Sequence, residues 1–486
     1  MTSAAASTDR SAPQDLETGL LIGERWRQSS ARFTVRDKFS GQAIAEVSEA
    51  SAEEVSEAVT AAVAAFKRGA PVPRERAAIL RRARDLLAEA RPLFVSTIIA
   101  ETGFTHTEAN NEVDRSLITL ELSAEEATRI TGEMVPFASS PGQESRIGFT
   151  MRFPLGVVCA ITPFNSPLNT VMHKVAPAFA AGNAVVLKPS VFTPLTGALL
   201  CRILVEAGMP AGFINLVQGS GSRIGNLLLQ NQAIAFYAFT GSTRVGLLVQ
   251  QHAGLRRCQL ELGSIASTIV CADADLALAT TKIGNAGFRK AGQVCTSVQL
   301  VFVERPVLAE MSERLLGHVS ALKVGDPHQQ TTTMGPLIDE AEADRVCTWV
   351  KEAKSSGARV ITGGERSRSL VQPVLLDKID RSMKVFNREI FGPVISLVPF
   401  DSIDEAVDGA NASEYGLAAG IFTRDISRGL RAAQKMRFGG VHINEASSSR
   451  ADGMPFGGVK QSGFGREGPR YAIAEMSEER LITLNP

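Results

Sequence analysis

Cys295 is the residue whose setting bears most directly on chemistry. It lies in the stretch FRKAGQVCTS, with Arg289 and Lys290 five to six positions upstream. Neighbouring cations lower a thiol pKa and favour the nucleophilic thiolate, and the Ala-Gly pair before Gln293 permits close approach of the backbone. Free cysteines are also among the most buried residue types. The stretch alone therefore leaves three alternatives open: a buried filler, half of a disulfide, or a nucleophile.

Two further polar residues follow or interrupt apolar runs. Asn165 follows the run GVVCAI at a turn flanked by prolines; its neutral amide suits an oxyanion, although a turn asparagine commonly satisfies its own backbone. Glu261 lies in the apolar segment LELGSIAS. A buried carboxylate has a raised pKa and can act as a general base, or it can form a structural salt bridge.

Two glycine-rich turns have the composition of phosphate-binding loops. Gly219, Gly221 and Gly225 form G-x-G-x-x-x-G, one residue longer than the usual dinucleotide fingerprint. In FTGST, Gly241 and Ser242 follow an apolar run and open a helical pattern, and the N-terminus of such a helix can accept a pyrophosphate.

The composition narrows the functional classes. The 486 residues, 44% hydrophobic and 21% charged, predict two or three domains. Lys+Arg and Asp+Glu both number 51, giving zero net charge, which argues against nucleic-acid binding. The six cysteines show no C-x-x-C pair and the six histidines no metal-ligand spacing, so we expect a reduced, cytoplasmic protein without a metal site. The composition of residues 1–18 predicts a flexible arm rather than a targeting signal. No apolar stretch of the sequence is long enough to span a membrane.

Hydrophobic periodicity predicts an α/β protein. Ser51 and Glu54 have capping-box spacing at the start of a helix, and helical periodicity resumes over about 75–130. From about 155 short apolar runs alternate with helical segments, and this pattern repeats from about 265. Alternation of this kind is typical of parallel sheets in layered α/β domains.

Seven motifs in one order carry a family resemblance. The Asn165 turn, NAVVLKPS, FTGST, ELG, GQVC, EIFGPV and PFGGVKQSGFGREG together resemble the NAD(P)-dependent aldehyde dehydrogenase superfamily over about residues 20–486. The resemblance implies an α/β fold with a Rossmann-like cofactor-binding domain (19–136 and 156–262) and an α/β catalytic domain (263–450). It also implies a small β flap for oligomerisation (137–155 and 470–486), and hence a homodimer or homotetramer.

The resemblance also implies roles for single residues. Cys295 is the thioester-forming nucleophile, the Asn165 amide and the Cys295 N–H form the oxyanion hole, Glu261 activates water, and Lys174 and Glu467 relay protons. NAD or NADP is expected to contact Ile161, Thr162, Pro163, Phe164, Lys188, Ser190, Val191, Gly221, Gly225, Phe239, Thr240, Gly241, Ser242, Leu262, Gly263, Glu389 and Phe391.

The chain departs from the family pattern at two positions. Ser264 stands where a second glycine is common, and serine lacks the backbone freedom of glycine. Val191 stands where many NAD-preferring members carry a carboxylate that repels a 2′-phosphate. Since that repulsion is absent, we expect NADP to be tolerated.

Cations at pocket positions indicate an anionic aldehyde. Arg289, Arg450 and His173 replace common aromatic residues of the pocket, and Arg115 matches a position that grips phosphate-bearing aldehydes. Thr296 and Phe456 complete the expected substrate-binding set, whereas Lys290 is expected to be solvated. Because arginine forks bind oxyanions, the leading substrate is a phosphonate aldehyde such as phosphonoacetaldehyde or phosphonoformaldehyde. The alternatives are succinate semialdehyde and lactaldehyde.

Two other reaction classes remain as alternatives. A CoA-acylating dehydrogenase usually lacks the general-base glutamate, whereas Glu261 is present. A cysteine-dependent acyl hydrolase or transferase needs a basic partner for Cys295, for which His173 is the nearest candidate, and it would leave the dinucleotide motifs unexplained.

Overall fold

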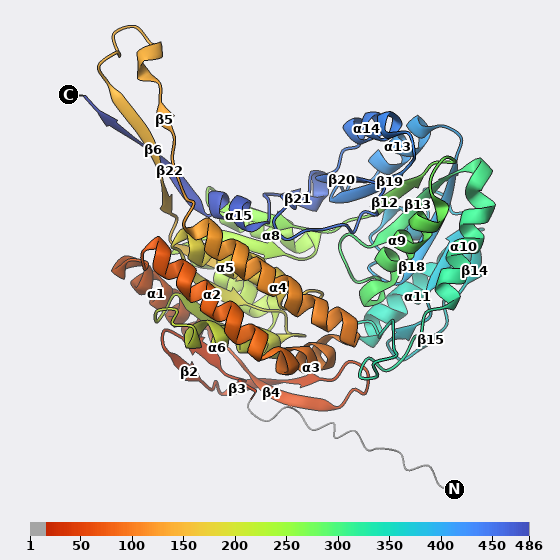
Figure 1. Ribbon diagram of the computed structural model, residues 1–486. Helices are drawn as coiled ribbons and strands as arrows, with labels where there is room; N and C mark the ends of the chain where they lie inside the picture. Colours follow the sequence, from red (N-terminus) through yellow and green to blue (C-terminus); the bar gives the residue numbers. More distant parts are fainter. Residues whose placement is uncertain (1–15, 486) are drawn as a thin grey trace.

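Two β-sheets form the centres of two α/β bodies in the computed structural model, which describes residues 16–485 (Figure 1). Most of the predicted arm, residues 1–15, lies outside the described residues. The two bodies lie side by side, and a narrow β flap projects from the first (Figure 1).

The first sheet has eight strands in the order β2-β1-β9-β8-β7-β10-β11-β21. Its five central strands are parallel and correspond to apolar runs of the sequence, because strands covered on both faces are apolar throughout. The strands are β1 (Leu20–Ile22), β2 (Arg25–Arg27), β7 (Val157–Ile161), β8 (Ala184–Lys188), β9 (Ile214–Leu216), β10 (Ile234–Thr240), β11 (Arg257–Glu261) and β21 (Gly463–Phe464).

Helices cover both faces of this sheet (Figure 1). The Ser51–Glu54 capping box is present at the start of the first helix, with both reciprocal hydrogen bonds. The antiparallel hairpin of β3 (Ala31–Arg36) and β4 (Ala43–Glu49) borders the domain. The helices are α1 (Ala52–Arg68), α2 (Pro73–Glu89), α3 (Arg91–Thr102), α4 (His106–Ala127), α5 (Asn169–Ala181), α6 (Pro194–Glu206), the π-helical turn η2 (Gly221–Gly225), α7 (Asn226–Gln230) and α8 (Thr243–Ala253).

The second sheet has seven strands in the order β14-β17-β18-β13-β12-β19-β20, parallel except for the edge strand β14. It comprises β12 (Ala266–Val270), β13 (Val298–Glu304), β14 (Arg359–Thr362), β17 (Val374–Asp377), β18 (Val394–Phe400), β19 (Ala418–Phe422) and β20 (Gly440–Ile443). Around it lie α9 (Leu276–Phe288), α10 (Leu308–Ser320), α11 (Glu340–Ser355), α12 (Lys384–Asn387), α13 (Ile403–Asn411) and α14 (Ile426–Lys435), and a separate small hairpin is formed by β15 (Arg366–Ser367) and β16 (Leu370–Val371).

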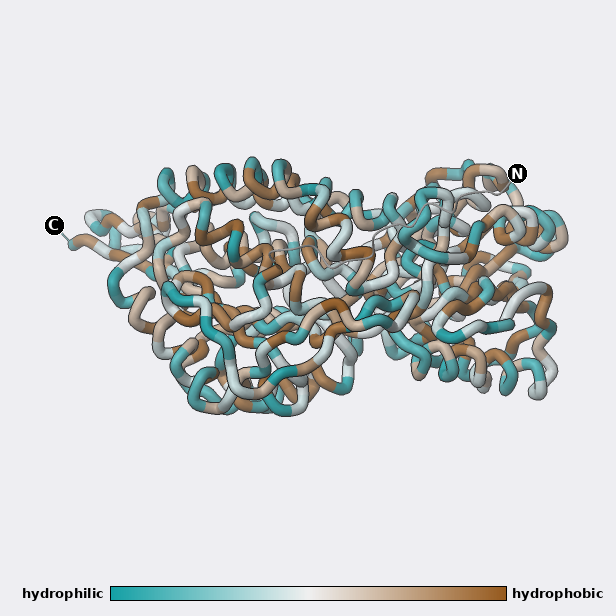
Figure 2. The backbone as a smooth tube through the Cα atoms, turned by 90° about the horizontal axis from the view of Figure 1, so that it is seen from below, coloured by the Kyte–Doolittle hydropathy of each residue, from teal (hydrophilic) through white to brown (hydrophobic). Residues whose placement is uncertain are grey.

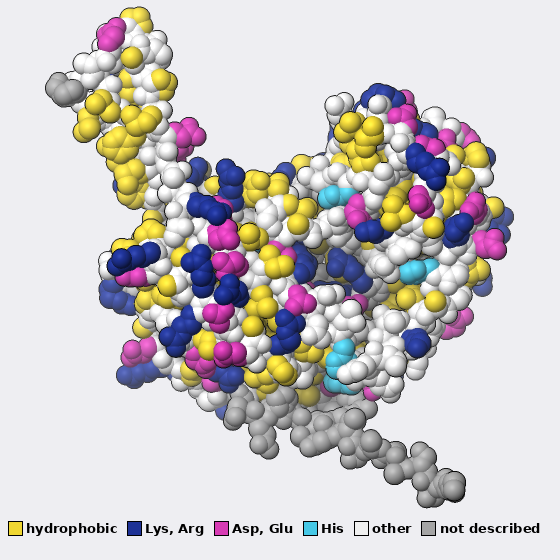
Figure 3. Space-filling model, in the orientation of Figure 1, with side chains coloured by type: hydrophobic (Ala, Val, Ile, Leu, Met, Phe, Trp, Pro, Cys, Tyr) yellow, Lys and Arg dark blue, Asp and Glu magenta, His cyan; other side chains and the backbone are white. Residues whose placement is uncertain are grey.

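The flap is a three-stranded antiparallel sheet of β5 (Met134–Val135), β6 (Ile147–Pro154) and β22 (Ser477–Leu484). Its surface carries many hydrophobic side chains (Figure 3). Residues 470–475, assigned to the flap in the sequence, instead belong to α15 (Pro469–Glu475), which packs against α4 and α5.

The cores follow the two sheets: one apolar cluster fills the first body and two lie against the second sheet. In Figure 2 hydrophobic and hydrophilic residues alternate along the outer helices, as in amphipathic helices that cover a core. Within residues 16–485 no helix is long and apolar enough to cross a membrane, and no cluster of histidine, cysteine and carboxylate side chains could hold a metal ion.

Candidate active site

A cavity of about 920 Å³ lies where loops of the two bodies meet. It opens at the carboxyl ends of parallel strands, the usual position of ligand sites in α/β sheets. Of the site residues predicted from the sequence, those that line it are Arg115, Pro163, Phe164, Asn165, Thr240, Gly241, Ser242, Glu261, Leu262, Gly263, Arg289, Cys295, Thr296, Glu389, Phe391, Arg450, Phe456 and Glu467. Those outside its lining are Ile161, Thr162, His173, Lys174, Lys188, Ser190, Val191, Gly221, Gly225 and Phe239.

Cys295 lies half-buried in the cavity wall, in the loop between α9 and β13. Burial and the neighbouring Glu261 carboxylate raise the pKa of its thiol to about 12, and the Arg450 guanidinium opposes this rise. The resting side chain is therefore a thiol, and it must lose its proton in order to attack.

Asn165 lies in the turn between β7 and α5 and is 9% exposed. Its Nδ2 donates a hydrogen bond of 2.9 Å to the backbone oxygen of Gln293, two residues before Cys295. The structure thus brings the amide and the thiol, which are 130 positions apart in the chain, to the same stretch of backbone.

Glu261 is the last residue of β11 and is 3% exposed. Neither of its carboxylate oxygens has a hydrogen-bond partner within residues 16–485. Burial, reinforced by the nearby Glu467 carboxylate, raises its pKa well above the ordinary value. An unpartnered carboxylate with a raised pKa beside a thiol has the chemistry of a general base.

Glu467 is held between two cations. Its Oε1 lies 2.8 Å from Lys174 Nζ, and its Oε2 lies 2.7 Å from Arg450 Nη2. Burial opposes its ionisation, but Lys174 and Arg450 together hold the pKa of Glu467 far below its usual range. The Arg450 guanidinium also stacks over the Phe456 ring, with its Cζ 3.9 Å from the ring centroid. Contacts within the protein thus already engage the charge of Arg450.

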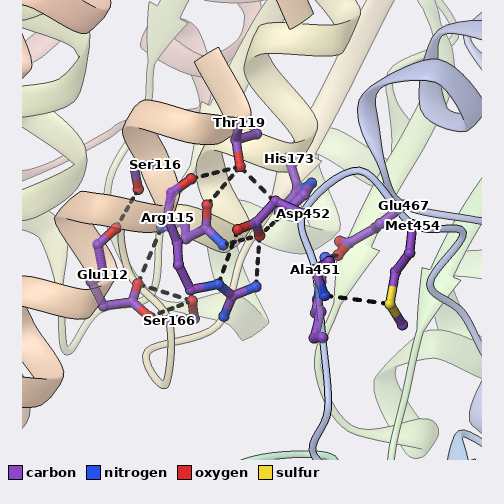
Figure 4. A network of polar contacts seen from close by, with 12 residues as sticks. Glu112, Arg115, Ser116, Thr119, Ser166, His173, Ala451, Asp452, Met454 and Glu467 are labelled. Carbon is purple, nitrogen blue, oxygen red and sulfur yellow. Dashed lines mark hydrogen bonds and ion pairs between the residues drawn. The ribbon is translucent and has the colours of Figure 1, made fainter. Parts of the chain in front are cut away.

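Asp452, which is outside the cavity lining, binds both Arg115 and His173 (Figure 4). Arg115 binds it through two bonds, Nη2–Oδ1 at 2.7 Å and Nε–Oδ2 at 3.2 Å, and His173 Nε2 lies 2.9 Å from Oδ1. His173 is fully buried and, contrary to the prediction, does not reach the cavity. The sequence interpretation missed Asp452, and its neighbour Arg450 was no guide to its role, because Asp452 pairs with Arg115 and Arg450 pairs with Glu467.

Arg289 differs from the other two arginines. Within the described residues its guanidinium has no carboxylate partner: Nη2 donates to Ser448 Oγ at 2.6 Å, and the buried Nε has no partner. Ser448 Oγ is also 3.0 Å from Thr296 Oγ1. Burial and the charge of Arg115 lower the pKa of Arg289. Ser448, which the sequence interpretation overlooked, thus joins Arg289 and Thr296 in a polar patch beside Cys295.

Lys290 corrects the expectation that it is solvated. It is 7% exposed, and its Nζ lies 2.7 Å from Glu112 Oε1 on α4 and 2.8 Å from the Asn165 carbonyl oxygen. The alternation that separates neighbouring side chains on a strand does not hold here, because Lys290 and Ala291 lie in a kinked turn with left-handed backbone angles.

Residues 26–482 match the model of the aldehyde dehydrogenase family. The chain belongs to this family. It is 44% identical to the 3-sulfolactaldehyde dehydrogenase of Priestia aryabhattai over 96% of this chain and 98% of that protein. Among solved structures, the NADP-dependent glyceraldehyde-3-phosphate dehydrogenase of Bacillus halodurans C-125 complexed with NADP superposes with a TM-score of 0.94 at 34% identity, covering 97% of this chain and 100% of that one. Aldehyde dehydrogenase 21 of Physcomitrella patens, in complex with the reaction product succinate, gives 0.94 at 33% identity, covering 96% and 98%.

The protein is therefore an aldehyde dehydrogenase that uses NAD or NADP, and the fold and family predicted from the motifs are confirmed. The cofactor side of the cavity fits a dinucleotide. Thr162 Oγ1 and Thr240 Oγ1, at the ends of β7 and β10, are buried without a partner in the described chain, and Ser242 caps α8 without a side-chain bond to its first turn. These groups leave donors and acceptors for hydroxyl and phosphate groups.

The glycine of the ELG motif allows Glu389 to approach this side of the aldehyde dehydrogenase cavity. A Cβ on Gly263 would lie 2.8 Å from Glu389 Oε2. Glu389 Oε1 accepts a hydrogen bond of 2.9 Å from the Ser264 N–H, and burial raises the pKa of Glu389 to about 7. Ser264 does not have a positive φ, so the serine that departs from the family pattern is accommodated without backbone strain.

Proposed function

We propose that this aldehyde dehydrogenase oxidises a small aldehyde whose far end carries a single negative charge, with 3-sulfolactaldehyde as the leading candidate, and releases the carboxylic acid. The observation that carries the proposal is Arg289: a guanidinium in the cavity wall without a carboxylate partner, six residues before the thiol. A partly buried cation without a counter-ion is unfavourable, and an anionic ligand would neutralise it.

The charge balance of the cavity favours a monoanion over the phosphonate dianion that heads the sequence-based candidates. Arg115 is paired with Asp452, and Arg450 with Glu467, so that of these three arginines Arg289 has no carboxylate partner among the described residues. A sulfonate carries one charge on three oxygens. Those oxygens can accept from the Arg289 guanidinium and from the Thr296 hydroxyl, both of which line the cavity. Ser448, which is outside the lining, accepts a hydrogen bond from Arg289 and so helps to hold the guanidinium in place. The 44% identity to a 3-sulfolactaldehyde dehydrogenase supports the same choice.

Cys295 and Asn165 provide the first chemical step of the proposal. The thiol gives its proton to water and adds to the aldehyde carbon, and the resulting alkoxide lies in a hole formed by the Asn165 amide and the Cys295 N–H. The nicotinamide dinucleotide, when bound, supplies the two-electron acceptor that converts the adduct on Cys295 into a thioester. A thiol suits both steps, because it is a good nucleophile and a good leaving group.

Glu261 provides the second step. Its unpartnered oxygens take a proton from a water molecule that attacks the thioester, which releases the carboxylic acid and restores the thiol. The presence of this base favours hydrolysis of the thioester over transfer of the acyl group to CoA. In the acyl hydrolase alternative His173 would be the base for Cys295. The structure does not favour this role, because His173 is bonded to Asp452 and does not line the cavity.

Oxidation of a panel of aldehydes tests which charged group the substrate carries at the end away from the aldehyde, here called the head group. 3-Sulfolactaldehyde, phosphonoacetaldehyde, succinate semialdehyde and lactaldehyde are each oxidised with NAD and with NADP, and reduced-cofactor absorbance is followed. We expect the highest kcat/KM for the sulfonate, followed by the carboxylate. Preference for neutral lactaldehyde over every anionic aldehyde would contradict the proposal.

The cofactor preference depends on Val191, which is half-buried directly after Ser190. We expect Val191→Glu to lower kcat/KM for NADP at least about tenfold and to leave NAD within about threefold, because the new carboxylate repels a 2′-phosphate. Val191→Gln is the matched control, since it has the same shape without the charge. An equal loss with both cofactors would place Val191 away from the 2′ position.

We further propose that the flap joins copies of the chain into a homodimer or homotetramer. Met134, Ile147 and Leu481 are 70%, 47% and 51% exposed on it, and exposed apolar patches of this kind mark interaction surfaces. Light scattering is expected to give twice or four times the monomer mass, and a charged substitution at Leu481 is expected to shift it toward the monomer.

A further inference from the structure

Lys290 is held at both ends by one face of α4. Its backbone N–H donates to Glu108 Oε1, and its Nζ pairs with Glu112 Oε1 at 2.7 Å. Glu108 and Glu112 are four residues apart, so they share a helix face. The ammonium also lies 4.5 Å from the centroid of the Phe104 ring. These contacts hold the ammonium group of Lys290 in one position.

The Glu112 carboxylate is saturated with donors. Besides Lys290 it accepts from Ser166 Oγ at 2.9 Å and from the Asn169 N–H at 3.1 Å. Although burial opposes ionisation, Lys290, the charge of Arg115 and the Asn169 N–H together hold the pKa of Glu112 below its usual value. Ser166 belongs to the turn that carries Asn165, and Asn169 is the first residue of α5, so Glu112 connects this segment to Lys290.

Lys290 then binds the Asn165 turn directly. Its Nζ donates a bond of 2.8 Å to the Asn165 carbonyl oxygen, while the Asn165 amide donates one of 2.9 Å to the Gln293 carbonyl oxygen. The loop that carries Cys295 thus binds Asn165 both at its backbone carbonyl oxygen and at its side-chain amide. Both bonds are buried, where hydrogen bonds hold geometry strongly.

The backbone of Lys290 is strained. Lys290 has φ 52° and ψ 33°, and Ala291 has φ 51° and ψ 37°, both in the left-handed region. Non-glycine residues in this conformation are costly and persist only where the surroundings over-determine them. The bonds from Lys290 to Glu108 and Glu112 supply that restraint, and the two left-handed residues lie five and four positions before Cys295.

We propose that Lys290, through its pair with Glu112, is a positioning residue that sets the Asn165 amide relative to Cys295 and so forms the oxyanion hole. The inference rests on the proposed roles of Asn165 and Cys295. It does not depend on the substrate's head group. Since its charge is compensated by Glu112, Lys290 contributes geometry rather than attraction for the anionic substrate.

Two reactions of Cys295 separate this role from a purely structural one. Acylation by an aryl acetate passes through a tetrahedral oxyanion and needs no cofactor, whereas alkylation by iodoacetamide forms no oxyanion. In Lys290→Met we expect acylation to slow about 10- to 100-fold, part of the loss that follows removal of an oxyanion-hole donor. We expect alkylation to change less than about twofold, because the thiol and its environment are retained.

The controls guard against misfolding and against failure of the proposed function. Lys282→Met removes another lysine–carboxylate pair of 2.7 Å, with Glu445, from α9 outside the cavity lining, and is expected to leave both rates unchanged. If Lys290→Met does not fold, the double variant Lys290→Asn with Glu112→Gln replaces it: asparagine tolerates the left-handed backbone and no buried charge is left unpaired. Cys295→Ala must abolish both reactions; if it does not, the proposed nucleophile fails, independently of Lys290.

Acylation that falls at least tenfold while alkylation is maintained supports the positioning role. Acylation that falls less than about tenfold would overturn it, because the hole would then form largely without the lysine. A parallel fall of both rates would also overturn it, since Lys290 would then act on the thiol rather than on Asn165.

Discussion

Replacing Glu261 with glutamine is expected to allow one turnover and then to stop the enzyme as an acylated protein. Glutamine preserves the shape of a side chain that is 3% exposed, but it cannot accept the proton of the attacking water. Rapid mixing with aldehyde and cofactor should give a burst of about one equivalent of reduced cofactor, followed by a steady-state rate lowered by about 1,000-fold, within the range for loss of a general base. Intact-protein mass should rise by that of the acyl group.

The pH dependence of the wild type gives a second test of Glu261. Its raised pKa means that the base form is populated only as the pH increases, so the deacylation rate should increase with pH and level off once that pKa is passed. In Glu261→Gln this ascending limb should disappear.

Glu475→Gln is the matched control for Glu261→Gln. Glu475 is another shielded carboxylate whose pKa burial raises, but it bonds the Arg466 N–H and the Gln259 amide and does not line the cavity. It should show normal turnover and no burst. A normal steady state in Glu261→Gln would remove Glu261 from the mechanism and reopen the transfer of the acyl group to another acceptor.

Replacing Arg289 with methionine is expected to separate anionic from neutral aldehydes. For the sulfonate, kcat/KM should fall about 100-fold or more, as it does when one partner of a buried charge pair is truncated. For neutral lactaldehyde it should change less than about threefold, because no charge pair is lost. Steady-state kinetics on the two substrates with saturating cofactor measure the ratio.

Arg289→Lys refines this test, because it retains the positive charge and removes the paired N–H donors of the guanidinium. Lysine provides a point charge instead of paired N–H donors, so we expect an intermediate loss with the sulfonate. Equal losses on charged and neutral aldehydes would show that Arg289 supports the loop that carries Cys295, and the head-group proposal would then fail.

Much of the fold was predictable from local sequence. Apolar runs and helical periodicity located the strands of the two parallel sheets, because residues buried on both faces must be apolar. The same patterns placed Asn165 after a strand, whereas the structure shows that Glu261 is the last residue of β11. Both positions are at the carboxyl ends of strands, so the two residues share one cavity edge with Cys295. The local pattern did not indicate that residues 470–475 would leave the flap to form α15, since that depends on packing against α4 and α5.

The sequence by itself determined the family, the order of the motifs and the residues that could carry the chemistry. Only the tertiary structure decided which charges remain available. Arg115, Arg289 and Arg450 look alike in the sequence, yet Asp452, 337 positions from Arg115, and Glu467 neutralise two of them. Lys290, which looked solvated, is buried against Glu112, 178 positions away. Ion pairs form between residues that the fold brings within a few ångströms, and a short stretch of sequence contains no information about such distant partners.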